Sequence, residues 1–480
     1  MPRLRGEELP GFLDVLQTWL PHQLWFPAQA GRWSLARVGG LRLTAPEGDT
    51  DPGLFLELHV FAVRGLDGGE QRISVPLTLR SRPSALAGKD ALVGRLSHEE
   101  LGEIWLYDGT RDRAFLAAWL EMARREQGTR NGRARGEAYS GFSQRKPFTV
   151  RLRRSCRDTE HITRALVTPE DVEDTAWGCR VVIDFLRRPE PGSPEAYDVL
   201  EALATARARC VPDLLGVVWG AWEQAGDADS GATGQTGAEQ ESIWDYGDLA
   251  LIREGALVAP DAETVAVEVA AAGYGFTGEA RGIGRALADV HADFAAAFGA
   301  YPQTALQAEE ASEEALVALE DAWKAVIEAD GFSHEERQRM ESHVGSLRSC
   351  LDAAAEPMTL QTIHGALSLT SFRRPEEHRG WIVDDAGGVQ EHGLPLTDAA
   401  AVVAVLAETA GDQRAFDVPA VTGAFLQGLA EGDSDTSWTS SALFRTQAVL
   451  RLLQLRGAAR LSQGDLDQVC AVLFDSAESA

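Results

Sequence analysis

The stretch that most constrains this chain is residues 360–388, LQTIHGALSLTSFRRPEEHRGWIVDDAGG. An apolar run leads into His364 and Gly365, a short loop follows, and a second apolar run, 381–383, ends at Asp384 and Asp385. A short apolar run of this kind is typical of a buried strand. We therefore expect a loop and then a strand that ends at carboxylates.

This pattern resembles the catalytic region of the protein-kinase-like superfamily. There, His-x-Asp is followed five residues later by Asn or Gln, and then by a strand that ends in a metal-binding Asp. His364 matches the histidine and Asp384 matches the metal-binding aspartate. However, Ala366 stands at the catalytic aspartate and Ser371 at the amide that would bind metal. The resemblance implies a kinase frame that has kept one of its three polar anchors.

Length and composition indicate a soluble globular protein of two or three domains, since the chain has 480 residues, of which 44% are hydrophobic and 25% charged. The formal net charge of −28 argues against nucleic acid or an anionic membrane as a partner. The sequence contains no apolar run long enough for a signal peptide or a membrane helix, so we expect a cytoplasmic protein. The cysteines are odd in number and widely spaced, which favours reduced thiols: Cys156, Cys179, Cys210, Cys350 and Cys470.

Residues 1–90 are expected to form a mostly β unit. A helix is predicted over 13–19, and the alternating segments 33–44, 54–65 and 72–83 predict antiparallel strands. The segments Trp19-Leu20-Pro21, Gln23–Phe26 and VPLTLR resemble the N-terminal cap of actinobacterial maltokinases. Aromatic residues at this spacing are more often part of a core than a sugar-binding platform, and we expect them in the core.

Residues 91–245 are expected to contain the smaller kinase lobe, with a helix over 114–126 and an exposed loop over 126–141. Residues 178–203 resemble the maltokinase segment in which a strand carries the ATP-binding lysine and a helix supplies that lysine's acidic partner. Aligning the Arg187-Arg188 and Pro191-Gly192 pairs places Asp184 at the lysine position, with Asp198 as the helix acid.

The glycine-rich phosphate loop of a kinase also has no counterpart in this sequence. No glycine occurs between Gly141 and Gly178, and we expect acidic residues in its place: Glu170, Asp171, Glu173 and Asp174. Residues 224–243 are poor in apolar residues and are interpreted as a flexible insertion. Residues 249–260 lie after this insertion and resemble the hinge strand of a kinase.

Residues 246–480 are expected to form a helical kinase-like C-lobe. A helical stripe in 276–299 resembles the maltokinase helix that ends in Val-His-Ala-Asp, and His291 on it is expected to be structural. Further helices are predicted over 313–329, after a capping box at Ser333 and Glu336, and over 394–408, 441–457 and 464–478.

The maltokinase resemblance implies an α+β, two-lobe kinase-like fold with a mostly β cap. It also implies ATP- and magnesium-dependent phosphorylation of maltose to maltose 1-phosphate, beside trehalose synthase in glycogen and α-glucan metabolism. The match fails at the lysine (Asp184), the base (Ala366), the second loop histidine (Ser368) and the amide ligand (Ser371). The metal strand ends in Asp384-Asp385-Ala386-Gly387-Gly388 instead of Asp-Phe-Glu-Gly-Glu.

Two functional hypotheses follow. The first is a pseudokinase with no catalytic residues and no expected cofactor, which binds maltose or an α-glucan, or docks onto an active maltokinase or trehalose synthase. The alternative is a divergent active maltokinase that uses ATP and magnesium, with Asp384 as the metal anchor; Asp385 would then also lie at the metal. A third reading is purely structural. No Gly-x-Ser-x-Gly, His-Glu-x-x-His or paired-cysteine motif supports a hydrolase or a zinc protein.

Overall fold

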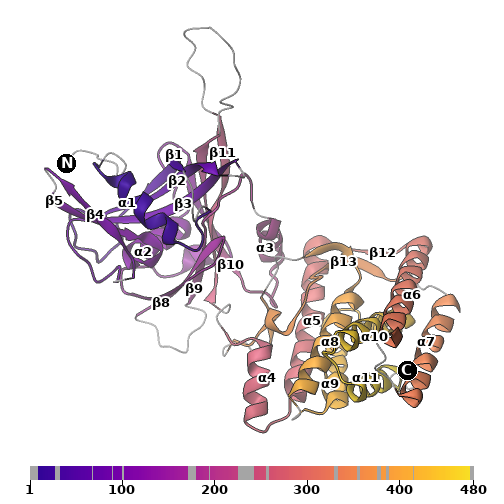
Figure 1. Cartoon of the computed structure of the whole chain (residues 1–480). Coiled ribbons are helices and arrows are strands. Elements are labelled where there is room, and N and C mark those ends of the chain that lie inside the picture. The colour runs from indigo at the N-terminus through magenta and orange to yellow at the C-terminus, as the bar shows by residue number, and fades with distance from the viewer. Residues whose placement is uncertain are drawn as a thin grey trace. The chain divides into compact units, whose positions relative to one another are not determined.

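The computed structural model describes residues 9–27, 33–66, 69–88, 90–99, 102–170, 180–193, 195–224, 243–255, 259–328, 333–353, 357–375, 380–384, 389–413 and 416–475. The chain divides into two compact units (Figure 1). The first unit contains residues 1–198 and 213–255, and the second contains 199–212 and 256–480. The second boundary between the units, after residue 255, lies within the segment 249–260 that resembles a hinge.

One antiparallel sheet runs through the first unit, in the order β4-β5-β3-β2-β1-β10-β11-β9-β8-β7, with β6 paired to β10. Its strands are β1 (Ser34–Leu43), β2 (Phe55–Leu66), β3 (Gly69–Arg80), β4 (Leu92–His98), β5 (Gly102–Asp108), β6 (Ala134–Ala138), β7 (Leu152–Asp158), β8 (Ile162–Pro169), β9 (Val181–Leu186), β10 (Leu214–Glu223) and β11 (Trp244–Glu254). Its helices are α1 (Phe12–Trp19) and α2 (Arg113–Arg124), and α3 (Glu195–Ala206) begins here and ends in residues of the second unit.

The predicted cap strands are confirmed as β1, β2 and β3. Both faces of β2 are covered, because Leu58 packs in a core with residues of α2 while Phe61 packs in a second core with residues of α1. Trp25 and Phe26 are buried in that second core, as expected for core aromatics. Two further strands, β4 and β5, extend this sheet beyond residue 90, and β5 pairs with β3.

The smaller-lobe strands follow the order β7-β8-β9-β11-β10 in the same sheet. The loop expected over 126–141 is partly a strand, since β6 pairs with β10 from Ala134 to Ala138. Cap and smaller lobe join at one pair of residues, Gly39 of β1 and Trp222 of β10. The strands are so close there that a Cβ atom on Gly39 would lie 2.7 Å from the carbonyl oxygen of Ala221. Glycine is therefore required at the junction.

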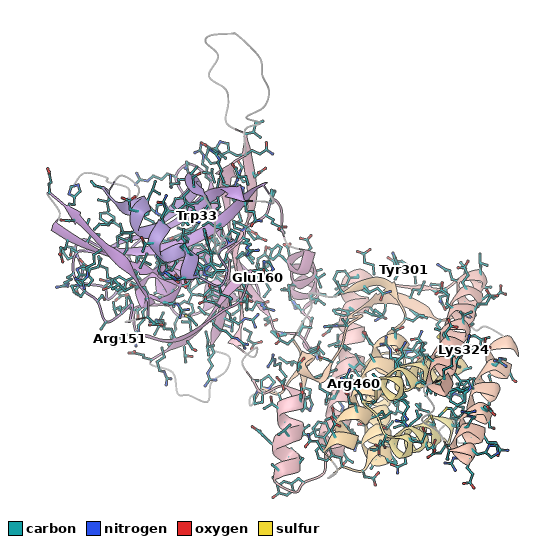
Figure 2. All side chains as sticks on the ribbon, viewed as in Figure 1. Trp33, Arg151, Glu160, Tyr301, Lys324 and Arg460 are labelled. Carbon is teal, nitrogen blue, oxygen red and sulfur yellow. The ribbon has the colours of Figure 1, made fainter. Side chains whose placement is uncertain are left out.

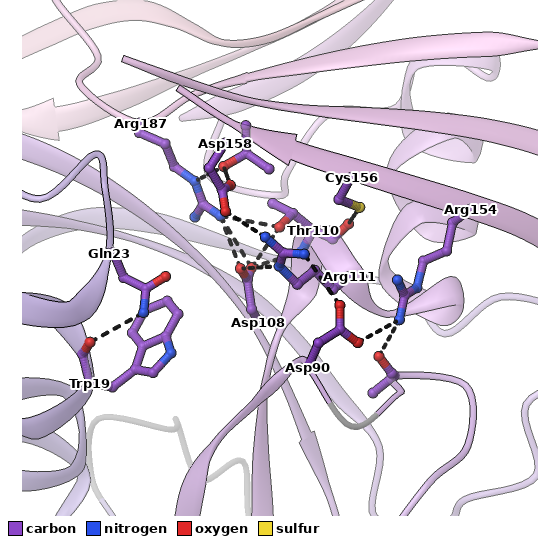
Figure 3. A network of polar contacts seen from close by, with 12 residues as sticks. Trp19, Gln23, Asp90, Asp108, Thr110, Arg111, Arg154, Cys156, Asp158 and Arg187 are labelled. Atoms are coloured by element: carbon purple, nitrogen blue, oxygen red, sulfur yellow. Dashed lines mark hydrogen bonds and ion pairs between the residues drawn. The ribbon is translucent and has the colours of Figure 1, made fainter. Parts of the chain in front are cut away.

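A buried polar network also joins these two parts of the first unit (Figure 3). Arg187, at the end of β9, is fully buried and donates to Asp108 at 3.1 Å and to Thr163 Oγ1 at 2.7 Å. Its guanidinium lies 4.4 Å from the centre of the Trp25 ring. Asp108 also accepts from the backbone N–H of Thr110. A buried arginine is tolerated here because its charge and its donors are satisfied.

Helices form most of the second unit, with three short strands, β12, β13 and β16, in one sheet. The helices are α4 (Ala262–Ala271), α5 (Thr277–Phe298), α6 (Ala305–Glu328), α7 (His334–Ala353), α8 (Pro395–Asp412), α9 (Val418–Ala430), α10 (Ala442–Gly457) and α11 (Gln463–Asp475). The strands are β12 (Ala300–Pro302), β13 (Thr359–Ile363), β14 (Phe372–Arg373), β15 (Ile382–Val383) and β16 (Gln390–Gly393).

Two glycines set the close packing of α5 against α9. A Cβ on Gly284 would lie 2.1 Å from the carbonyl oxygen of Phe425, and one on Gly428 would lie 1.9 Å from that of Arg281. The predicted capping box is confirmed, because Ser333 N donates to Glu336 and Glu336 N donates to Ser333 Oγ. No helix in the described part of the chain is both long and apolar enough to cross a membrane.

Candidate functional site

The residue at the lysine position, Asp184, lies on β9 and is almost completely buried. Its carboxylate accepts hydrogen bonds from Arg164 Nε at 2.7 Å and from Arg253 at 2.6 Å. Burial alone would raise the pKa of Asp184, but the two guanidinium groups outweigh burial and lower the pKa below its ordinary value. The aspartate is thus ionised and fixed between two cations from the neighbouring strands β8 and β11.

The other predicted residue of this half, Asp198, is exposed on α3. The hydrogen-bonding partners of Asp184 are arginines from strands, so its charge is paired within the sheet and not with the helix. This geometry leaves Asp198 on a solvated face of α3.

The loop that corresponds to a kinase phosphate loop joins two strands before the lysine strand. In this sheet those strands are β7 and β8, and the turn between them is 159–161, without glycine. Glu160 in this turn is labelled in Figure 2, and its side chain is 69% exposed. Glu170 follows β8 instead of lying in this turn, so its predicted place in the phosphate loop is wrong. Asp171, Glu173 and Asp174 lie outside the described residues.

In the second unit, Asp398 of α8 fixes the start of the degenerate catalytic loop. Its carboxylate accepts from the backbone N–H groups of His364 at 2.9 Å and Gly365 at 2.8 Å. It also lies 3.1 Å from His291 Nε2 of α5. Burial would raise the pKa of Asp398, but these hydrogen bonds outweigh it and lower the pKa. All three residues are buried: His291, Asp398 and His364. Asp398, which contacts both histidines, is therefore a structural clamp on this loop.

The three loop positions that carry chemistry in kinases carry no carboxylate or amide here. Ala366 is exposed and presents a methyl group. Ser371 is buried, and its Oγ accepts from the backbone N–H of Ser368 at 3.3 Å. Ser368 Oγ lies 2.7 Å from Thr370 Oγ1. The serine hydroxyls therefore cap a short 3₁₀ turn, Leu369–Ser371, within the loop.

Asp384, the predicted metal anchor, follows β15 and forms an ion pair instead. Arg373 Nε donates to its Oδ2 at 2.8 Å, and Arg373 also donates to the carbonyl oxygen of Ala259. Asp385 lies outside the described residues. Within the described ranges no three His, Cys, Asp or Glu side chains are grouped as a metal site. A guanidinium thus stands beside the Asp384 carboxylate, and magnesium would have to compete with it for the carboxylate oxygens.

Sequence reasoning did not find the three arginines that pair with these acids. Arg164 lies directly opposite Asp184 in the register of β8 and β9. Arg253 lies two residues beyond Leu251, which is the partner of Asp184 on β11. Side chains two residues apart share one face of a strand, so the register would have revealed both pairs, but register is a tertiary property.

A polar pocket of about 580 Å³ lies elsewhere in the second unit, along α6, α8 and α10. Amide side chains dominate its wall: Gln303, Gln307, Gln390, Gln447 and Gln454. Glu310, Glu314 and Arg451 add charge of both signs. Burial lowers the pKa of Arg451, although the negative charge of Asp398 opposes this shift. Sequence analysis did not identify this pocket, because its residues come from segments that are far apart in the chain.

Comparison with known proteins supports the cap and the fold. The family model of the maltokinase N-terminal cap domain matches residues 19–112. The sequence matches no curated protein significantly. A glucosamine kinase solved with glucosamine, ADP and inorganic phosphate is 18% identical, and the alignment covers 97% of this chain and 99% of that chain with a TM-score of 0.50.

More distant structures give lower scores. Crystal form B of glucosamine kinase is 17% identical, covers 92% of this chain and 96% of that one, and has a TM-score of 0.48. A choline kinase from Cryptosporidium parvum Iowa II is 8% identical over 75% of this chain and 94% of its own, with a TM-score of 0.32. The cap match ends at residue 112, close to the end of β5, and the chain is α+β, with a large sheet in the first unit and mostly helices in the second. Residues 19–112 therefore match a maltokinase N-terminal cap domain, and the fold of the chain is similar to that of a glucosamine kinase.

Proposed function

We propose that this protein is a non-catalytic member of the kinase fold, a maltokinase-like pseudokinase that acts by binding. The observation that carries the proposal is that the acids at two positions aligned with the kinase motif are paired with arginines. Asp184 is neutralised by Arg164 and Arg253, and Asp384 is neutralised by Arg373. A carboxylate does not attract phosphate, and one that is already paired within the protein does not leave its oxygens to a cation.

The magnitude of the losses supports this proposal. A positioned general base contributes about 10²–10⁴ in rate, and Ala366 has no group that accepts a proton. Kinases of ordinary activity turn over at about 1–100 per second. Removing the base and the lysine together leaves a rate of little metabolic value, even though such losses do not simply multiply.

Retained binding of a sugar is the role that the second unit supports. The pocket along α6, α8 and α10 offers planar amides and two carboxylates, which pair well with sugar hydroxyls, beside apolar side chains such as Leu360 and Leu450. We therefore propose maltose or a short α-glucan as its ligand. In this proposal the protein acts in the cytoplasm and in α-glucan or trehalose metabolism, with an active maltokinase or trehalose synthase as its protein partner.

The deciding experiment measures turnover. Purified protein is incubated with magnesium, ATP and maltose, and ADP and maltose 1-phosphate are quantified. We expect neither product above the level of a buffer control. The Asp384→Asn variant identifies contaminating kinases, because their activity would not change with it. Maltose 1-phosphate formed over many turnovers by the wild type and lost in Asp384→Asn would overturn the proposal.

Sugar binding has its own test, since a protein can bind maltose without phosphorylating it. Maltose is expected to raise the unfolding temperature of the wild type, and Arg451→Met or Gln447→Leu should reduce that shift. Lys324→Met is the matched control, because Lys324 is exposed on α6 outside the pocket (Figure 2). A shift that Lys324→Met removes as effectively as Arg451→Met would contradict this assignment.

A divergent active maltokinase is the second candidate, and the position of Asp384 favours it. The carboxylate has kept its place directly after β15, where the metal-binding aspartate of a kinase stands. This candidate requires Arg373 to release Asp384 when magnesium and ATP bind. It predicts a saturable rise in unfolding temperature with magnesium and ATP together, and a larger rise in Arg373→Ala.

A further inference from the structure

The first unit contains a large polar groove that the proposed function does not use. Its volume is about 1000 Å³, and it lies along β1 and the segment 127–133. Four arginines and two glutamates line it: Arg37, Arg42, Arg130, Arg133, Glu57 and Glu223. The formal charge of this lining is positive, although the whole chain carries −28. Because cations are concentrated in this groove of a strongly acidic protein, the groove is expected to attract small anions.

The floor of the groove is a chain of hydrogen bonds across β1 and β2. Arg37 Nε lies 3.1 Å from His59 Nδ1, and His59 Nε2 lies 3.1 Å from Glu57. Burial alone would raise the pKa of Glu57, but His59 and Arg42 lower it to about 2. Glu57 is therefore ionised and held by hydrogen bonds from its neighbours on the two strands.

The wall of the groove is a turn that presents two arginines. Gly132 N donates to the carbonyl oxygen of Thr129, and Arg133 N donates to Asn131 Oδ1. The carbonyl oxygen of Arg133 accepts from Ala221 of β10, which ties the turn to the sheet. This local hydrogen bonding fixes the backbone before any ligand arrives, and that reduces the entropic cost of binding.

Arg130 and Arg133 are exposed on this turn, and within the described residues neither forms an ion pair. Arg133 lies 3.5 Å from the centre of the Trp244 ring, which orients its guanidinium beside the groove. Guanidinium groups bind phosphate oxygens through paired N–H donors. The remaining wall supplies neutral donors and acceptors from Thr44, Thr129 and Asn131, which suit a hydroxylated ligand.

From these features we propose that this groove of the first unit binds a phosphate monoester of a hydroxylated small molecule, with Arg130 and Arg133 as the phosphate-binding residues. The excess of two positive charges in the lining matches the charge of about −1.5 to −2 that a phosphate monoester carries near pH 7. The volume is within the range of small-molecule sites. This inference is independent of the proposed function, because it involves only the first unit and no turnover.

The test is titration calorimetry on the full chain at low ionic strength, with glucose 1-phosphate, inorganic phosphate, glucose, glucuronate and sulfate as probes. We expect glucose 1-phosphate to bind more tightly than every other probe. Arg130→Gln and Arg133→Gln should each weaken it about tenfold, which is the loss of one charge-assisted contact, and the double variant about a hundredfold. Binding should also weaken as sodium chloride is added.

The control is Arg151→Gln, which removes an exposed arginine of the same unit outside the groove (Figure 2). It should leave the affinity unchanged, and all the arginine variants should keep the wild-type unfolding temperature. The proposal is overturned if glucose 1-phosphate does not bind, or if the double variant binds it as tightly as the wild type. It is also overturned if sulfate or glucuronate binds as tightly as glucose 1-phosphate, which would indicate unspecific attraction of anions.

Discussion

At the scale of single residues, the acids at two positions aligned with the kinase motif have arginine partners. Asp184 lies between Arg164 and Arg253, and Asp384 lies beside Arg373. A buried charge without a partner costs several kcal/mol, so a lysine-to-aspartate change is tolerated only with cations nearby. The arginines therefore explain how the fold accommodates a carboxylate at residue 184, although its negative charge would repel the phosphates of ATP.

Restoring lysine alone should destabilise the protein. Asp184→Lys places a buried ammonium beside two partly buried guanidinium groups, and we expect a loss of about 3–5 kcal/mol in the free energy of unfolding, measured with urea. Asp184→Asn should cost less, because it adds no charge. In the charge-reversed variant Asp184→Lys, Arg253→Asp, part of the loss should return. A stable single lysine variant would mean that Asp184 does not depend on these arginines.

Glu57 should make stability depend on pH. Its pKa is lowered from 4.5 to about 2 in the folded protein. A carboxyl with a lowered pKa contributes its stability above the unfolded value, near pH 4.5, and loses it as the pH falls toward 2. Glu57→Gln should therefore cost about 3 kcal/mol near pH 6, and the difference from wild type should narrow between pH 4.5 and 2. Urea unfolding across this range measures the difference, and a gap independent of pH would contradict the ionised state.

At the scale of elements, α8 determines the conformation of the loop that follows β13. One carboxylate, Asp398, satisfies two backbone donors and a histidine from α5. The apolar face of α8 buries the acid at the first turn of the helix, where backbone N–H groups also favour a negative charge. Asp398 thus fixes the start of this loop, in which residue 366 is an alanine.

Removing this clamp should loosen the loop selectively. Asp398→Ala leaves two buried N–H groups and His291 without their acceptor, and we expect a loss of about 3–5 kcal/mol. Hydrogen exchange of residues 364–371 should accelerate more than that of α10 or α11. Asp398→Asn keeps one carbonyl acceptor. Its stability and its exchange rates should therefore lie between those of the wild type and Asp398→Ala. Uniform acceleration over the whole second unit would show that Asp398 acts on global stability alone.

At the scale of the whole molecule, the chain forms two compact units with separate cores. Such units often unfold as separate steps. We expect two calorimetric transitions. Arg187→Met should lower only the one that belongs to the first unit, because all hydrogen-bond partners of Arg187 lie there. Asp398→Ala should lower only the other. A single transition that both variants shift equally would contradict this division.

Sequence patterns located most elements, because period and capping are local properties. The three cap strands, the capping box at Ser333 and the long helices α5, α8 and α10 lie where they were predicted. Strand β6 was predicted as loop because its arginines and glycines do not alternate; pairing with β10 makes it a strand. The cysteines that the structure describes are free thiols, as the spacing indicated.

The sequence alone determined that an alanine stands at residue 366 and a carboxylate at residue 184, since residue identity needs no structure. It also determined the cap, whose aromatic and apolar spacing is local. Only the tertiary structure decided that Arg164, Arg253 and Arg373 neutralise the remaining acids, and that distant arginines share one groove. The physical reason is that strand register and helix packing place these charges, and both depend on contacts between segments far apart in the chain.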